Sequence, residues 1–159
     1  MDLGLNGRVA VVGASTHGLG RACATELARA GCTLVVNGRD PASAARVAEE
    51  IAGQTGARVI PVAADLGTLA GQDALIDAAP AVDILVTNNG GPPFRDFREV
   101  DQEALLAGIT MNMAAPIRLV QKVVDGMMDR QFGRIVNITS ARSRPRSPVW
   151  TSPAGRAPD

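Results

Sequence analysis

The residues best suited to chemistry stand where short apolar segments end. A Val-rich run over residues 8–14 leads into the segment Gly13-Ala14-Ser15-Thr16-His17-Gly18-Leu19-Gly20. Glycines permit a tight turn and a close approach of the backbone to a pyrophosphate, and a helix start offers free N–H groups and a positive dipole. The segment is therefore a candidate phosphate-binding turn, although a simple strand-to-helix turn can show the same pattern.

A basic side chain follows the second apolar run, which ends in Asn37, Gly38 and Arg39. Dinucleotide-binding folds place an acidic residue here for the ribose hydroxyls of NAD, or a basic one for the 2′-phosphate of NADP. A guanidinium suits a phosphate through its charge and its forked donors. Arg39 therefore favours NADP, with NAD as the alternative; a solvated surface arginine is the other interpretation. Asp40 is better explained as a helix cap.

Other reactive side chains are few. His17 is the only histidine, and its place in the glycine-rich turn is compatible with a position near the phosphates or with an exposed loop imidazole. It has no partner cluster, so we expect no metal site. Cys23 and Cys32 fit two small buried residues in a reducing cytosol, and we expect a cytoplasmic protein.

The spacing of apolar residues indicates the elements that would position these groups. Runs typical of buried strands cover residues 8–14, 32–39, 57–65, 82–90 and 133–140, and helical spacing covers residues 18–31, 40–56, 68–80 and 98–131. Strands that alternate with helices form βαβ units. The sequence predicts a Rossmann-type, doubly wound α/β fold with five parallel strands in the order 3-2-1-4-5. Pro116 is expected to distort the longest helix.

Length and charge narrow the function classes. The 159 residues suggest one domain, and 16 basic residues balance 16 acidic ones, so no nucleic-acid surface is implied. No apolar run is long enough to span a membrane, and the N-terminus does not resemble a secretion signal. Residues 141–159 are rich in Pro and Arg without apolar periodicity. We expect a dinucleotide-binding domain over residues 1–140 and an irregular tail over residues 141–159.

Several motifs together resemble the short-chain dehydrogenase/reductase family, and most closely its 3-oxoacyl-carrier-protein-reductase-like group. They are VVGASTHGLG, ADL at Asp65, NNGG at residues 88–91, MNMAAP around Asn112, and GRIVNITS. Their order and spacing extend over nearly all of residues 7–140. The resemblance implies an NADP-dependent oxidoreductase that acts on a small-molecule carbonyl or alcohol substrate and forms homo-oligomers.

The resemblance also implies roles for single residues. Asp65 and Leu66 would hold the adenine, and Asn89, with Gly90 beside it, would approach the cofactor ribose. Asn112 would support a water in a proton relay. Gly90 departs from the family's usual alanine. In the first turn, too, an ungapped alignment places the family's first glycine on Ala14 and its preceding threonine on Gly13.

The largest departure concerns catalysis. By resemblance, Ser140 would hydrogen-bond the substrate carbonyl, and a tyrosine about thirteen residues later would act as proton donor, with a lysine four residues further on. Those positions are Pro153 and Ala157 here, the chain contains no Tyr, and Lys122 lies in the preceding helix. The acid–base step therefore lacks its usual donor. The family's further strands, substrate loop and dimerisation helix would also lie beyond the end of this chain.

We expect the tail to be a frameshift product. Read from the third base of the Arg142 codon, with permissible codons, it becomes V-K-A-P-I-P-x-L-D-L-S-x-G-A-R-A-G. This string resembles a divergent branch of the family, with Ser and Arg in the tyrosine and lysine positions; the nucleotide sequence tests it. Three functions stay open: an NADP-dependent oxidoreductase, inactive or impaired as this truncated chain; a non-catalytic dinucleotide-binding module; and a non-functional product of a damaged gene.

Overall fold

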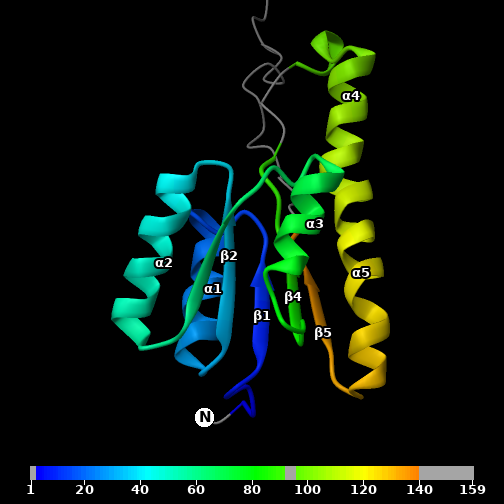
Figure 1. The fold of residues 1–159 in the computed structure, drawn as a ribbon. Helices are drawn as coiled ribbons and strands as arrows, with labels where there is room; N and C mark the ends of the chain where they lie inside the picture. Colours follow the sequence, from blue (N-terminus) through cyan, green and yellow to red (C-terminus); the bar gives the residue numbers. More distant parts are fainter. Residues whose placement is uncertain (1–2, 92–95, 140–159) are drawn as a thin grey trace, which may run out of the picture.

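The computed structural model describes residues 3–91 and 96–139, which form a parallel sheet covered by helices on both faces (Figure 1). The strands are β1 (Val9–Val12), β2 (Thr33–Gly38), β3 (Val59–Ala63), β4 (Ile84–Thr87) and β5 (Arg134–Asn137). Their order across the sheet is β3-β2-β1-β4-β5, and every neighbouring pair is parallel. The predicted doubly wound α/β fold and its strand order are confirmed. Ser140 and the expected irregular tail lie outside the described residues.

Helices cover both faces of the sheet (Figure 1). The helices α1 (Gly18–Arg29) and α2 (Pro41–Thr55) pack on one face, and α3 (Leu69–Asp77) and α5 (Ala115–Asp129) pack on the other. Side chains alternate between the faces along each strand. In β1, for example, Val12 joins the core under α1 and α2, whereas Val11 joins the core under α3 and α5.

The ends of α2 follow from its sequence. The Asp40 carboxylate accepts a hydrogen bond of 2.8 Å from the Ser43 backbone N–H, and Pro41 begins the helix. Hydrogen bonds from Ser43 hold the pKa of the Asp40 carboxyl below its usual value. At the other end, Gly56 has a left-handed φ of 73°, a conformation that glycine adopts without strain. Asp40 is therefore the helix cap that the sequence predicted.

The helix around Pro116 is distorted. Helix α4 (Gln102–Ile109), which follows a short 3-10 turn η1 (Phe97–Glu99), continues into α5 through a π-helical turn η2 (Thr110–Ala114). Proline has no N–H, so Pro116 cannot donate to Asn112 as in an α-helix or to Met111 as in a π-helix. The expected distortion is thus a widened turn in a continuous helix.

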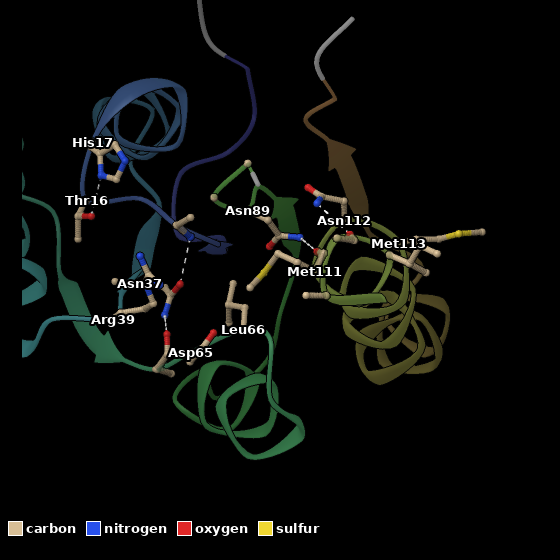
Figure 2. Close-up of a pocket in the computed structure, with 18 of the residues that line it drawn as sticks. Thr16, His17, Asn37, Arg39, Asp65, Leu66, Asn89, Met111, Asn112 and Met113 are labelled. Carbon is tan, nitrogen blue, oxygen red and sulfur yellow. Dashed lines mark hydrogen bonds between the residues drawn. The ribbon is translucent and has the colours of Figure 1, made fainter. Parts of the chain in front are cut away.

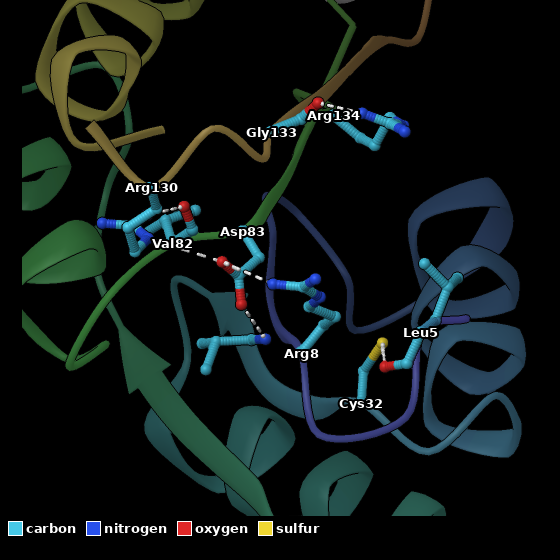
Figure 3. Close-up of polar contacts among 9 residues, drawn as sticks. Leu5, Arg8, Cys32, Val82, Asp83, Arg130, Gly133 and Arg134 are labelled. Carbon is cyan, nitrogen blue, oxygen red and sulfur yellow. Dashed lines mark hydrogen bonds and ion pairs between the residues drawn. The ribbon is translucent and has the colours of Figure 1, made fainter. Parts of the chain in front are cut away.

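The Asp83 carboxylate, just before β4, joins several elements at the amino end of the sheet (Figure 3). One oxygen of Asp83 accepts a hydrogen bond of 3.0 Å from the Val9 backbone N–H. The other lies 3.9 Å from the Arg8 guanidinium and 3.6 Å from that of Arg130, which also donates to the Val82 carbonyl. The Asp83 side chain is only 10% exposed. It therefore connects the start of β1 with the end of α5.

Strand β5 forms one edge of the described sheet, and all of its residues are exposed. Ile135 is 37% exposed and Val136 is 48% exposed. An exposed, apolar edge strand offers unpaired backbone groups to other chains.

Candidate cofactor-binding site

A pocket of about 1210 Å³ lies at the carboxyl ends of the central strands (Figure 2). One wall comes from the β1–α1 turn and from the ends of β2 and β3. The opposite wall comes from the residues after β4 and from the helix that runs from α4 through η2. Doubly wound folds bind ligands in this place, outside the carboxyl ends of the strands.

The β1–α1 turn is held from two sides by polar side chains. The Ser15 hydroxyl donates to the Val12 carbonyl and accepts from the Asn37 N–H, both at 2.8 Å. The Asn37 side-chain oxygen in turn accepts from the Ala14 N–H at 3.1 Å. From β4, the Asn88 amide donates to the Ala14 carbonyl, also at 3.1 Å. The turn is therefore fixed to both neighbouring strands before any ligand binds.

Glycines let this turn pack closely against its surroundings. A Cβ on Gly13 would lie 2.7 Å from the Asn88 carbonyl oxygen, and one on Gly20 would lie 2.5 Å from that of Ala14. At the end of β2, a Cβ on Gly38 would lie 2.4 Å from the side-chain methyl carbon of Thr16. Such approaches exclude any larger residue unless the backbone moves.

Of the sequence-predicted residues in the turn, Thr16 and His17 line the pocket. The pocket lining does not include the others, which are Gly13, Ser15, Gly18, Leu19 and Gly20. Ser15 is fully buried, and its hydroxyl donates to the Val12 carbonyl rather than toward the pocket. Leu19 is 67% exposed. The structure therefore gives most of the turn a supporting position behind Thr16 and His17.

The start of α1 faces the pocket without a cap. His17 occupies the cap position but makes no side-chain capping hydrogen bond, and the first turn of α1 contains no acidic residue. The His17 ring nitrogen Nδ1 instead lies 3.1 Å from the Thr16 hydroxyl oxygen. An uncapped helix start leaves N–H groups and a positive partial charge available to an anion.

At the ends of β2 and β3, Arg39, Asp65 and Leu66 line the same part of the pocket (Figure 2). The exposed Arg39 guanidinium makes no ion pair with any residue in the described ranges 3–91 and 96–139. The Asp65 carboxylate accepts from the Gly67 N–H at 2.9 Å, which sets its direction. Leu66 is 4% exposed.

The opposite wall contains Asn89, Gly90 and Asn112. The Asn89 amide donates to the Met111 carbonyl in the π-helical turn η2. Its side-chain oxygen is buried and has no partner among the described residues. Asn112 is exposed to the pocket, and its amide donates to Gly108 in the same helix at 3.0 Å. The contact with η2 therefore holds the Asn89 amide.

The residues around the pocket fit a phosphate-bearing dinucleotide. They offer an uncapped helix start, a guanidinium without an ion-pair partner among the described residues, and a buried amide oxygen that lacks a donor among the same residues. In the described part of the chain, no three His, Cys, Asp or Glu side chains gather as a metal site would require. The same part contains no helix with the length and apolar character needed to cross a bilayer.

The structure also shows supporting residues that sequence reasoning did not select. Asn37 is 2% exposed, and its amide donates to the Ala64 carbonyl at 3.0 Å, so it links the ends of β1, β2 and β3. A polar residue inside an otherwise apolar strand was the available signal for Asn37. Asn88 could be noticed in the sequence only as the first residue of the NNGG motif, which gave it no role of its own. Lys122, in contrast, pairs with Asp73 of α3 at 2.8 Å and does not line the pocket.

Comparison with known proteins identifies the family. A family model described as short chain dehydrogenase matches residues 8–152. The chain belongs to the short-chain dehydrogenase family. The predicted resemblance, including its 3-oxoacyl-carrier-protein-reductase-like character, is confirmed.

Relatives within the short-chain dehydrogenase family are considerably longer than this chain. It is 33% identical to the uncharacterized oxidoreductase YvaG of Bacillus subtilis, over 88% of this chain and 53% of that protein. It is also 33% identical to the 3-oxoacyl-[acyl-carrier-protein] reductase of Aquifex aeolicus, over 88% of this chain and 58% of that protein. The crystal structure of L-sorbose reductase from Gluconobacter frateurii, complexed with NADPH and L-sorbose, matches with a TM-score of 0.82 at 31% identity, over 86% of this chain and 54% of that one. The chain thus spans little more than half the length of these relatives.

Proposed function

We propose that this short-chain dehydrogenase binds NADP(H) and belongs to an oxidoreductase that interconverts a small-molecule carbonyl and an alcohol. The observation that carries the cofactor assignment is Arg39, a guanidinium in the pocket wall without an ion-pair partner in the described part of the chain. The NADPH bound by the related L-sorbose reductase supports the same cofactor.

The pocket residues divide between the two ends of the cofactor. We assign Arg39 to the 2′-phosphate, Asp65 and Leu66 to the adenine, and the backbone around Thr16 and His17 to the pyrophosphate, where the start of α1 contributes its N–H groups. When bound, the nicotinamide would supply hydride chemistry.

On the opposite wall, the Asn89 side-chain oxygen is assigned to a ribose hydroxyl, because it is buried and has no donor in the described part of the chain. Gly90 follows Asn89 in the pocket lining. Asn112 belongs to the same wall, and we assign its side chain to the orientation of a water. Ser140, the proposed partner of the substrate carbonyl, lies beyond the described residues.

A second candidate function is cofactor binding without turnover. It is favoured by one observation on the sequence, which contains no Tyr and places Pro153 and Ala157 where the family resemblance expects Tyr and Lys. A phenol with a lowered pKa is an effective proton donor, and neither replacement can donate a proton. A non-functional gene product remains the third proposal and predicts no cofactor binding.

Titration of the purified chain with NADPH and NADH, followed by nicotinamide fluorescence, tests the cofactor assignment. NADPH should bind more tightly, because charge-assisted hydrogen bonds to the 2′-phosphate are absent from NADH. The Arg39→Asp variant should lower the ratio of the two affinities by about 10- to 100-fold, equivalent to roughly 1.5–3 kcal/mol.

Arg58→Asp is the matched control, because this exposed arginine precedes β3 at the amino end of the sheet. It should leave the affinity ratio unchanged. An Arg39→Asp variant that keeps the wild-type preference for NADPH would remove Arg39 from the site. Adding a panel of aldehydes and ketones, with absorbance of NADPH as the readout, then separates an oxidoreductase from a binding module.

A further inference from the structure

We propose that Gln72 of α3 is a positioning residue that fixes the adenine-binding turn of the cofactor pocket; this rests on the proposed NADP(H) function. Gln72 does not line the pocket. Its side chain reaches the backbone of Leu66, the buried residue beside Asp65, and therefore acts on the adenine end through that turn.

The turn from Asp65 to Thr68 is held by the start of α3. The Asp65 carbonyl accepts from the Thr68 N–H at 3.1 Å and from the Thr68 hydroxyl at 2.9 Å. The same hydroxyl accepts from the Gly71 N–H at 3.0 Å and so caps the helix. A Cβ on Gly71 would lie 2.0 Å from the Asp65 carbonyl oxygen. The first turn of α3 therefore packs directly against the backbone of the turn, and only glycine fits at position 71.

Gln72 supplies the contact that fixes Leu66 itself. Its side-chain amide donates to the Leu66 carbonyl at 2.8 Å, and the residue is 2% exposed. Without this contact, the hydrogen bonds around Asp65 would still hold the first half of the turn. The peptide that follows Leu66 would be free to rotate and to change the direction of the Asp65 side chain relative to the adenine.

A purely structural role explains Gln72 poorly. Its side-chain oxygen is buried and lacks a hydrogen-bond partner among the described residues, which is unfavourable compared with an apolar side chain of similar size. The other buried side chain of α3, Leu75, is apolar and packs in the core. The hydrogen bond to the Leu66 carbonyl, rather than packing in the core, therefore explains the amide at position 72.

The test compares NADPH with nicotinamide hypoxanthine dinucleotide phosphate, which lacks the exocyclic amino group of adenine. Wild-type protein should bind NADPH more tightly, because the proposed function assigns the Asp65 carboxylate to the adenine, whose amino group could donate to it. Gln72→Met keeps the volume and removes the donor, so the preference for NADPH should fall about fivefold, as expected for one lost hydrogen bond. Thermal unfolding by circular dichroism checks that the variant is folded.

Gln54→Met is the matched control, because Gln54 is exposed on α2 and does not line the pocket. It should not change the ratio. If Gln72→Met does not fold, Gln72→Asn, which withdraws the amide by one methylene, is measured in the same way. An unchanged ratio in a folded variant would overturn the role of Gln72. Absence of NADPH binding to the wild-type chain would instead overturn the proposed function.

Discussion

Replacing Asp83 with alanine is expected to destabilise the fold by about 2–4 kcal/mol. The hydrogen bond from Val9 to a nearly buried carboxylate is charge-assisted and contributes about 1.5–3 kcal/mol. The ion pairs with Arg8 and Arg130 involve arginine side chains that are 37% and 38% exposed, so each adds only about 0.2–1 kcal/mol.

Asparagine at position 83 separates the two contributions. Asp83→Asn keeps an oxygen that can accept from Val9 and removes the charge. It should therefore lose about half as much stability as Asp83→Ala. The control is Asp125→Ala, an exposed position on α5, where a change within about 0.5 kcal/mol is expected.

Urea unfolding followed by far-ultraviolet circular dichroism measures these differences. The midpoint should fall in the order wild type, Asp83→Asn, Asp83→Ala, with an unchanged dependence on urea concentration. For a domain of this size, the alanine variant should also melt about 10 °C lower. An alanine variant as stable as wild type, or an asparagine variant as unstable as alanine, would refute the assignment of the main effect to the Val9 hydrogen bond.

Two further predictions concern local strain and acid sensitivity. Ala14→Gly should raise the free energy of unfolding by about 0.5 kcal/mol, because relief of a left-handed φ of 43° outweighs the greater flexibility of glycine in the unfolded chain. Gln131→Gly, at a φ of 52°, should have the same effect. A urea midpoint below that of the wild type would contradict this prediction. Hydrogen bonds from Lys122, and then from Arg118, lower the pKa of the Asp73 carboxyl in the folded state. The ionised carboxylate therefore stabilises the fold at a pH above its unfolded-state pKa, and this contribution is lost as the pH falls through the folded-state pKa. Asp73→Asn should consequently melt below wild type at pH 7 and together with it near pH 2, and a difference that persists in acid would argue against the ion pair.

The fold could be predicted because each of its determinants is local in the sequence. Alternation of apolar strands and helices gives the layers, and right-handed crossovers restrict the order of the strands. Asp40 and Gly56 mark the ends of α2 through contacts within a few residues. The distortion at Pro116 could be predicted from the missing N–H, but its form as a π-helical turn could not, because a helix can accommodate a proline in several ways.

The candidate site could be predicted only in part. Arg39 and Asp65 could be found because each follows directly on a strand whose carboxyl end forms the pocket. The supporting residues Asn37, Asn88 and Gln72 bond to backbone groups that lie six or more positions away, so a single-sequence pattern does not identify their partners. The left-handed Ala14 was unexpected for the same reason, since the turn that imposes it is held by residues from other strands.

The two walls of the pocket come from separate parts of the chain, the first from residues 14–66 and the second from residues 89–113. A ligand that touches both walls would join the two parts and favour the state in which both are folded. At a free concentration one hundred times its Kd, such a ligand adds about 2.7 kcal/mol to stability. Proteolytic cleavage that requires local opening would then slow by about two orders of magnitude. The cellular concentration of the dinucleotide would in this way influence how long the chain survives proteolysis, as well as the fraction of pockets that hold a ligand.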